Sequence, residues 1–129
     1  MKFAIYLMCI PLLWLGTSCT AQENNASNID GRTFFITSYM PDGSKSEDEY
    51  IYFKEGTLEG SECSKYGYDQ PKYTVSDDGK IEATMQSSEQ GTLKWEGQIK
   101  NGVFTGTSYW KKEGQEDIRF TFKGSEVKE

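Results

Sequence analysis

The 129-residue sequence contains no histidine. Histidine is the commonest general base of enzymes and the usual partner of serine and cysteine nucleophiles, so its absence excludes those nucleophilic sites in their usual form. A zinc site would lack imidazole ligands for the same reason. A pair of carboxylates could still hydrolyse a glycoside, but no spacing of Asp and Glu residues selects such a pair. The sequence therefore predicts a protein that is not an enzyme and carries no cofactor and no metal.

Positive charge is also scarce, with 14 Lys and Arg residues against 20 Asp and Glu residues and a net charge of −6. Binding to the phosphate backbone of a nucleic acid needs clustered positive charge, which this composition does not offer. The negative surplus favours solubility and would attract a basic partner. We therefore expect no nucleic-acid ligand.

Long apolar runs are limited to the N-terminus, where residues 3–15 are apolar and are interrupted only by Pro11. Lys2 precedes this run and a small polar group, residues 16–18, follows it. This is the three-part layout of a secretory signal, and the run is shorter than the ~20 residues that a spanning helix needs. We predict a removed signal peptide over residues 1–18.

The stretch Gly16-Thr17-Ser18-Cys19 at the end of this leader resembles the bacterial lipobox. The resemblance implies cleavage before Cys19 and acylation of its thiol, which would make the protein a membrane-anchored lipoprotein of the bacterial cell envelope. Ordinary cleavage after Ser18 or after Ala21 is the alternative, and it would give a soluble periplasmic or secreted protein. Residues 19–30 are polar and Asn-rich, which predicts a disordered tether.

Cysteine is limited to Cys9, Cys19 and Cys63, so the mature domain has no disulfide framework. A bond between Cys19 and Cys63 requires that Cys19 is not lipidated. We expect Cys63 to be a small buried residue in a strand formed by "TLEGSEC". The alternative is a redox-sensing thiol, which would need a nearby positive charge such as Lys65.

Alternation of apolar and polar residues dominates the chain from Arg32 onward. The clearest strand places Leu93, Trp95, Gly97 and Ile99 on one face, and the dipeptide Asn101-Gly102 after it is typical of a two-residue hairpin. Turn residues recur at Asp42-Gly43, Glu55-Gly56, Asp78-Gly79 and Glu113-Gly114. No helical pattern of about 10 residues competes with these strands.

These patterns predict an all-β domain over residues 31–125, followed by a tail at 126–129. Sequential hairpins favour a small up-and-down antiparallel barrel of about 7–8 strands, which would hide both sheet edges. Gly97, Gly106 and Gly124 lie inside the strand patterns, where they suit the bends or bulges that closure requires. A two-sheet β-sandwich is the alternative.

Acidic clusters interrupt this strand pattern at two places, Glu47-Asp48-Glu49 and Asp77-Asp78. Both clusters lie beside turn residues, so we expect solvated, charged loops. Calcium binding at Asp77-Asp78-Gly79 is disfavoured because the later ligands of the calcium-loop motif are absent.

A resemblance covers nearly all of the chain after Gly31. The segments "GRTFFITSYMPDGS", "SECSKYGYDQPKY" and "GTLKWEGQIKNGVFTGTSYWKKEGQEDIRFTFKG" resemble short uncharacterised bacterial secreted proteins and lipoproteins with a lipocalin-like β-barrel. The resemblance implies that fold but no activity and no functional residues. True lipocalins carry a Gly-x-Trp signature in the first strand, where this chain has Thr33 at the tryptophan position.

Aromatic residues make up 14% of the chain, more than its turns can use, so most of them must lie on the sheet. A barrel of eight strands is either filled by such side chains or holds one small ligand. The irregular segment with Tyr66, Tyr68 and Tyr73 is the place where we expect binding. The first functional hypothesis is a binding protein for a small apolar ligand, and the alternative is a protein-binding module such as an inhibitor of a basic enzyme.

The leader generates the first testable prediction. Labelled palmitate should be incorporated into the wild-type protein and not into the Cys19→Ala variant, because the Cys19 thiol is the acceptor of the lipid. The measurement is autoradiography of the protein purified from labelled cells. Absence of label from both proteins would end the lipoprotein hypothesis.

Overall fold

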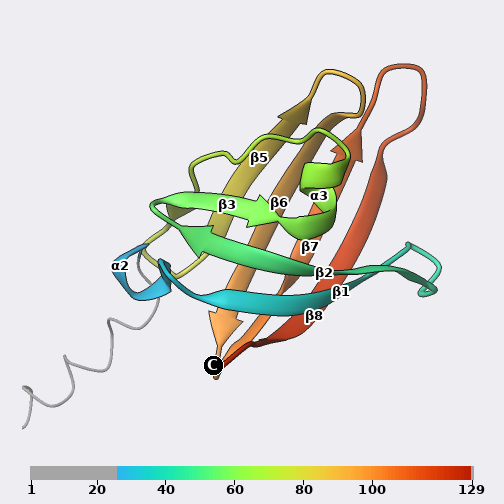
Figure 1. Cartoon of the computed structure of the whole chain (residues 1–129). Coiled ribbons are helices and arrows are strands. Elements are labelled where there is room, and N and C mark those ends of the chain that lie inside the picture. Colours follow the sequence, from blue (N-terminus) through green and yellow to red (C-terminus); the bar gives the residue numbers. More distant parts are fainter. Residues whose placement is uncertain (1–25, 129) are drawn as a thin grey trace, which may run out of the picture.

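The computed structural model of the chain describes residues 26–128, which fold into eight antiparallel strands and two short helices (Figure 1). The strands are β1 (Thr33–Tyr39), β2 (Lys45–Lys54), β3 (Thr57–Gly60), β4 (Thr74–Val75), β5 (Ile81–Ser87), β6 (Gly91–Lys100), β7 (Val103–Lys111) and β8 (Ile118–Glu126). The helices are α2 (Ala26–Ile29) and α3 (Ser61–Lys65). The all-β prediction is therefore confirmed.

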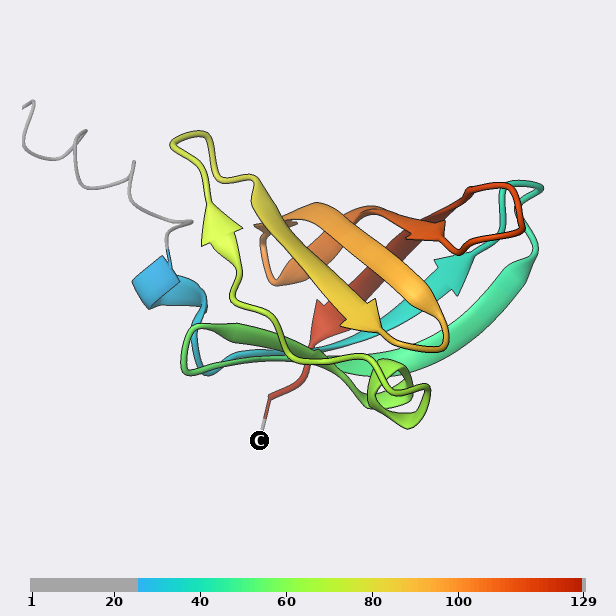
Figure 2. The same cartoon turned by 90° about the horizontal axis from the view of Figure 1, so that it is seen from above.

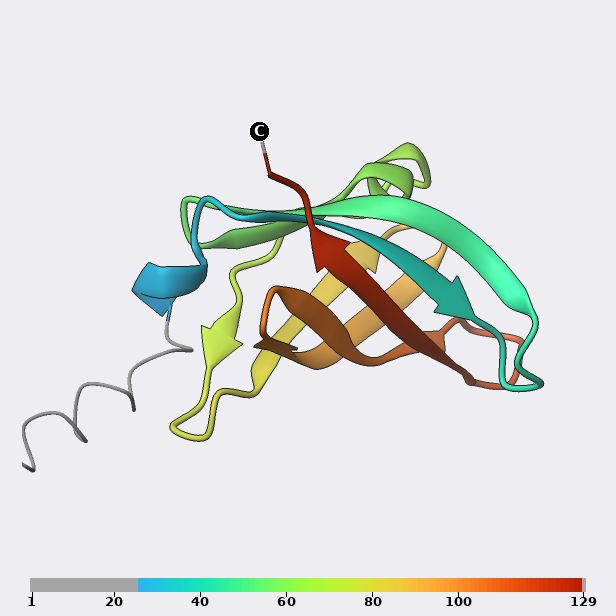
Figure 3. The same ribbon diagram turned by 90° about the horizontal axis from the view of Figure 1, so that it is seen from below.

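All eight strands belong to one strongly curled sheet with the order β3-β2-β1-β8-β7-β6-β5-β4. Strands that follow one another in the chain pair with each other, except for β3 and β4, which form the two edges. β1 pairs with β8, so the first and last strands lie side by side in the middle of the sheet (Figures 2 and 3). This is the expected up-and-down meander in a barrel-like shape. The β-sandwich alternative is excluded because there is one sheet rather than two.

Closure of the barrel is incomplete between β3 and β4, in contrast to the fully closed barrel that we expected. Residues 61–73 form helix α3 and an irregular segment instead of a strand. Two backbone hydrogen bonds join the edges at one end of the sheet, from Leu58 N to Pro71 O (2.9 Å) and from Tyr73 N to Gly56 O (3.2 Å). Pro71 has no N–H of its own, so it cannot extend a ladder here.

Two hairpin turns have positive φ at both central residues. The φ angles are 52° at Asn101 and 76° at Gly102, and 53° at Glu55 and 79° at Gly56. Such angles match the twist of the flanking strands in two-residue hairpins. The hairpin predicted at Asn101-Gly102 is confirmed, and both turns lie at the same end of the sheet, called the packed end below.

Three strand glycines allow neighbouring strands to approach closely. Gly97 of β6 lies opposite Gly106 of β7, and Gly124 of β8 lies opposite Ile36 of β1. A Cβ atom at Gly106 would overlap the carbonyl oxygen of Glu96, and one at Gly124 would overlap a carbonyl oxygen of β1. The register is regular at all three glycines, so they mark bends of the strands and not bulges.

The packed end is filled by an aromatic cluster around Phe104. Its ring centroid lies 5.6 Å from that of Phe34, 5.4 Å from Phe53 and 4.8 Å from Phe122. Trp95 extends the cluster through Phe122, at 5.1 Å. All five side chains are at most 2% exposed. This half of the sheet interior is therefore a packed core.

The limits of the domain differ from the predicted boundaries at both ends. Ile29 of helix α2 is fully buried, so residues 26–30 belong to the domain rather than to a disordered tether. β8 continues to Glu126, whose carboxylate forms a 2.8 Å ion pair with Arg32. The predicted signal peptide, residues 19–25 of the tether and the lipidation site Cys19 lie outside the described residues. None of the described helices has the length and apolar character that crossing a membrane requires.

The close approach at Gly124 generates a stability prediction. We expect Gly124→Ala to lower the free energy of unfolding by about 2 kcal/mol or more, because the added methyl group forces β1 and β8 apart. Gly114→Ala is the matched control, since its Cβ would meet nothing within 4 Å and only its positive φ of 90° is strained. Urea unfolding measures both. Equal losses in the two variants would contradict the role of Gly124 in strand packing.

Candidate ligand-binding site

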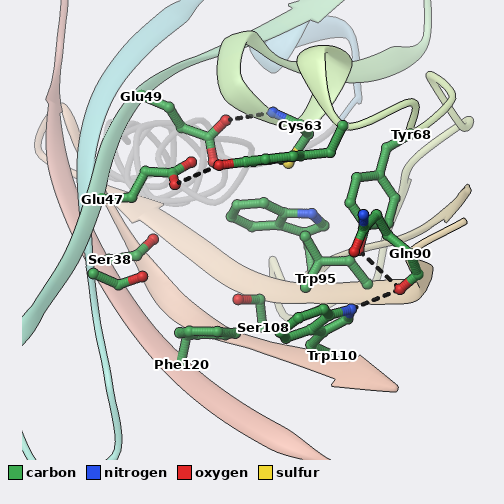
Figure 4. Close-up of a pocket in the computed structure, with 13 residues that line it drawn as sticks. Ser38, Glu47, Glu49, Cys63, Tyr68, Gln90, Trp95, Ser108, Trp110 and Phe120 are labelled. Carbon is green, nitrogen blue, oxygen red and sulfur yellow. Dashed lines mark hydrogen bonds between the residues drawn. The ribbon is translucent and has the colours of Figure 1, made fainter. Parts of the chain in front are cut away.

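A cavity of about 290 Å³ lies inside the curled sheet, next to the Phe104 cluster and separated from it by Trp95 (Figure 4). The end of the sheet that contains it is called the cavity end below. Strands β1, β2, β6, β7 and β8, helix α3 and the segments around Tyr68 and Gln90 supply its walls. The lining residues are Ser38, Ser46, Glu47, Glu49, Cys63, Tyr66, Tyr68, Gln90, Leu93, Trp95, Ser108, Trp110 and Phe120.

The cavity exists because inward-facing side chains become smaller along two strands. On β1 the inward residues Phe34 and Ile36 are followed by Ser38, and on β7 the inward Phe104 is followed by Gly106 and Ser108 before the larger Trp110. Ser38 and Ser108 are 9% and 3% exposed, so both face the interior. A serine leaves space that a Phe or Ile would fill, which makes this half of the interior hollow.

Glu49 points into this interior from β2, contrary to the expectation of a solvated loop at residues 47–49. Its neighbours on the same face are Ile51 and Phe53, and it is only 6% exposed. Its Oε1 accepts hydrogen bonds from the backbone N–H groups of Glu62 (3.0 Å) and Cys63 (3.3 Å) at the start of α3. The period of two, extended backwards from Phe53, was the signal that could have placed Glu49 inside.

Burial raises the pKa of Glu49 from its ordinary value of 4.5 to about 7, in spite of the two backbone N–H donors. The nearby carboxylate of Glu47 raises it further. Burial and the charge of Glu62 also raise the pKa of Glu47, whose Oε1 accepts a 3.5 Å hydrogen bond from the Tyr66 hydroxyl. The cavity thus contains two carboxyl groups that bind protons more tightly than solvated ones do.

Cys63 is buried and free, as expected, but it lies on helix α3 and not in a strand. Its Sγ is 3.8 Å from Glu49 Oε2. Burial and the Glu49 carboxylate raise the pKa of the thiol far above its usual range. Lys65 pairs with Glu62 at 3.1 Å. The thiolate that a redox sensor requires is therefore strongly disfavoured.

The structure brings together two of the three tyrosines that we expected to bind a ligand. Tyr66, which is 50% exposed, and Tyr68, which is 7% exposed, line the cavity. The Tyr68 hydroxyl donates to Gln90 O at 3.4 Å. Tyr73 does not line the cavity: its ring packs against Phe53 with centroids 5.1 Å apart, in the packed end.

Two tryptophans on the cavity wall differ in their hydrogen bonding. Trp110 Nε1 donates to Gln90 O at 2.7 Å. Trp95 is 2% exposed, and its Nε1 has no hydrogen-bond partner. Figure 4 shows this indole nitrogen on the side of the ring that faces Tyr68. Leaving a buried N–H group without an acceptor costs about 1–3 kcal/mol of folding free energy, so the unpaired Nε1–H of Trp95 destabilises the fold.

No protein-family model, no curated protein and no solved structure matches the chain. Within residues 26–128, no three His, Cys, Asp or Glu side chains gather in a way that could hold a metal ion. Function therefore has to be inferred from the cavity and its side chains.

Burial of Glu49 generates a prediction on pH and stability. Glu49 binds its proton more tightly in the folded protein than in the unfolded chain, so its contribution to stability is present at low pH and is lost as pH rises from about 4.5 to about 7. We expect Glu49→Gln to be about 1–3 kcal/mol more stable than the wild type at pH 8 and nearly equal to it at pH 5.

Urea unfolding at pH 5, 6, 7 and 8, followed by tryptophan fluorescence, measures this difference. The control is Glu82→Gln, which removes a carboxylate whose side chain is 40% exposed on β5. A Glu49→Gln variant that is less stable at pH 8 and keeps the wild-type pH profile would contradict the prediction.

Proposed function

We propose that this chain is a non-catalytic binding protein that holds a small, largely apolar molecule in the cavity. The observation that carries this proposal is that half of the interior is tightly packed with aromatic rings, while the other half forms a cavity of about 290 Å³ that opens to solvent. Ligand sites in proteins are concave pockets of this kind, so the cavity is the place where we expect a ligand.

The character of the walls supports a ligand that is mostly apolar. Trp95, Trp110, Phe120, Leu93 and Tyr68 offer ring and aliphatic surface, while serine hydroxyls and the Gln90 amide supply a few polar groups. Ligand sites in proteins combine a mainly apolar wall with a small number of polar groups that orient the ligand. The volume is at the lower end of the range for such sites.

Binding rather than catalysis is favoured by the use of the buried carboxylate. Glu49 Oε1 already accepts two backbone N–H groups of α3, which holds the helix against β2. We assign Glu49 a role in shaping the wall and in contacting the ligand. As part of the same proposal, the protein belongs to the lipocalin-like envelope proteins that its sequence resembles, and it is anchored through lipidated Cys19.

The second candidate function, a protein-binding module, is favoured by a row of aromatic rings on the outer face of β1 and β2. Phe35 and Tyr50 are 41% and 42% exposed, and their ring centroids are 4.8 Å apart. Tyr52 continues the row at 6.2 Å from Tyr50. An inhibitor of a basic enzyme could use this face, with the negative charge of the chain guiding the encounter.

Native mass spectrometry of the full chain, extracted gently from its own cells, tests the proposal. We expect an adduct that is lost on denaturation. Ser108→Leu should reduce this adduct, because the larger side chain fills the cavity, whereas Thr105→Leu on the exposed face of the same strand should not. A protein without adduct, from cells in which it is correctly processed, would contradict ligand binding and favour the protein-binding candidate.

A further inference from the structure

The cavity contains two carboxyl groups and, among the described residues, no Lys or Arg side chain in its lining. Two lysines lie near this wall without lining it: Lys65 Nζ pairs with Glu62 and its side chain is 69% exposed, and Lys112 Nζ lies 3.5 Å from Gln90 Oε1. We propose that the cavity selects a small organic cation: a protonated amine on an aromatic or aliphatic body, with the ammonium group held by Glu47 and Glu49. This inference rests on the ligand-binding function proposed above.

Both carboxylates have room for a further donor. Glu49 uses Oε1 for the backbone N–H groups of α3, and within residues 26–128 its Oε2 has only the long 3.8 Å contact to Cys63 Sγ. Glu47 accepts the Tyr66 hydroxyl on Oε1 at 3.5 Å. An ammonium group carries three donors, so it can be shared by two carboxylates on the same wall. The positive charge of the ammonium group would offset the free-energy cost of keeping Glu47 and Glu49 ionised in the cavity.

A second, independent observation points to a ligand in the same cavity. Trp95 is 2% exposed, lines the cavity and has an Nε1–H group with no partner. The Nε1 atom itself is covered in this structure, so a ligand that carries a hydrogen-bond acceptor would satisfy this donor only by displacing the side chains that cover it. The rings of Trp95, Trp110 and Phe120 can contact the body of the ligand, and the face of such a ring also attracts a cation.

The volume of the cavity and the negative charge of its two carboxylates limit the choice of ligand further. A volume of about 290 Å³ corresponds to roughly ten groups of the size of a water molecule, which suits an arylalkylamine. A fatty acid or another carboxylate ligand would place a third negative charge beside Glu47 and Glu49. Like charges in a site of low polarity repel strongly, so we expect anions to be excluded.

Binding of the amine should depend on pH because burial places the pKa of Glu49 at about 7. The groups that act on Glu49 are the Glu47 carboxylate on β2 and, on α3, the backbone N–H groups of Glu62 and Cys63 and the Cys63 thiol, while Lys65 acts on Glu47. Protonation of Glu49 below about pH 7 removes one of the two charges that hold the ammonium group. The affinity for an amine should therefore fall between pH 8 and pH 6, and that for a neutral analogue should not.

Three probes of similar size and different charge test whether the cavity selects a cation: 2-phenylethylamine, 2-phenylethanol and phenylacetate. Each is titrated into the full chain, and the indole N–H resonances are followed in proton–nitrogen NMR spectra. The Trp95 signal, assigned with Trp95→Phe, reports on the cavity. The Trp110 signal reports that the wall stays folded, since its N–H is bound to Gln90 O.

We expect the amine to bind at least about tenfold more tightly than the alcohol, and the acid to bind more weakly than both. Glu47→Gln and Glu49→Gln should each reduce the preference for the amine over the alcohol about tenfold. Glu82→Gln changes the net charge equally from outside the cavity and should preserve the preference.

Equal affinities for amine and alcohol, with a shifted Trp95 signal, would overturn cation selection and leave the binding function standing. A preference for the acid would overturn it as well. If none of the probes moves the Trp95 signal, the cation inference is wrong. The mass-spectrometric adduct then decides separately whether the cavity binds another kind of molecule.

Discussion

The close approach of strands at Gly97, Gly106 and Gly124 is the constraint on which the rest of this structure depends. Without a Cβ at these positions, β7 can lie tightly against β6 and β8, and β8 against β1, so the sheet curls strongly. The curl brings the inward faces of distant strands together and creates one interior. Both the aromatic core and the cavity are consequences of this bend.

The interior is divided between a packed core and a cavity. Aromatic rings around Phe104 fill the packed end and exclude water, whereas two serines and two glutamates occupy inward positions at the cavity end. The Glu49 carboxylate contributes to both the fold and the cavity wall, because it binds the backbone at the start of α3 and also lines the cavity. A buried carboxylate with a raised pKa costs stability at neutral pH, and in the function proposed here the ligand uses its charge.

Several features were open to prediction because they depend on near neighbours in the chain. Alternation in β6, the turn at Asn101-Gly102 and the burial of Cys63 followed from local patterns. Predictions from local patterns were wrong where a residue distant in the chain decides the conformation. Glu49 lies in an acidic segment that is typical of a solvated loop. Its carboxylate is nevertheless inside the sheet, where it accepts hydrogen bonds from the backbone N–H groups of α3. The segment "TLEGSEC" has a strand-like beginning but turns into α3 after Gly60.

The sequence by itself determined the β class, the order of hairpins and the surplus of negative charge, since backbone preferences at turns and a period of two act over a few residues. Tertiary structure alone decided that β1 pairs with β8, that the ring of strands stays open between β3 and β4, and that Tyr68 faces a cavity while Tyr73 packs against Phe53. Those outcomes depend on which side chains meet across the interior, and such meetings join residues up to about 90 positions apart.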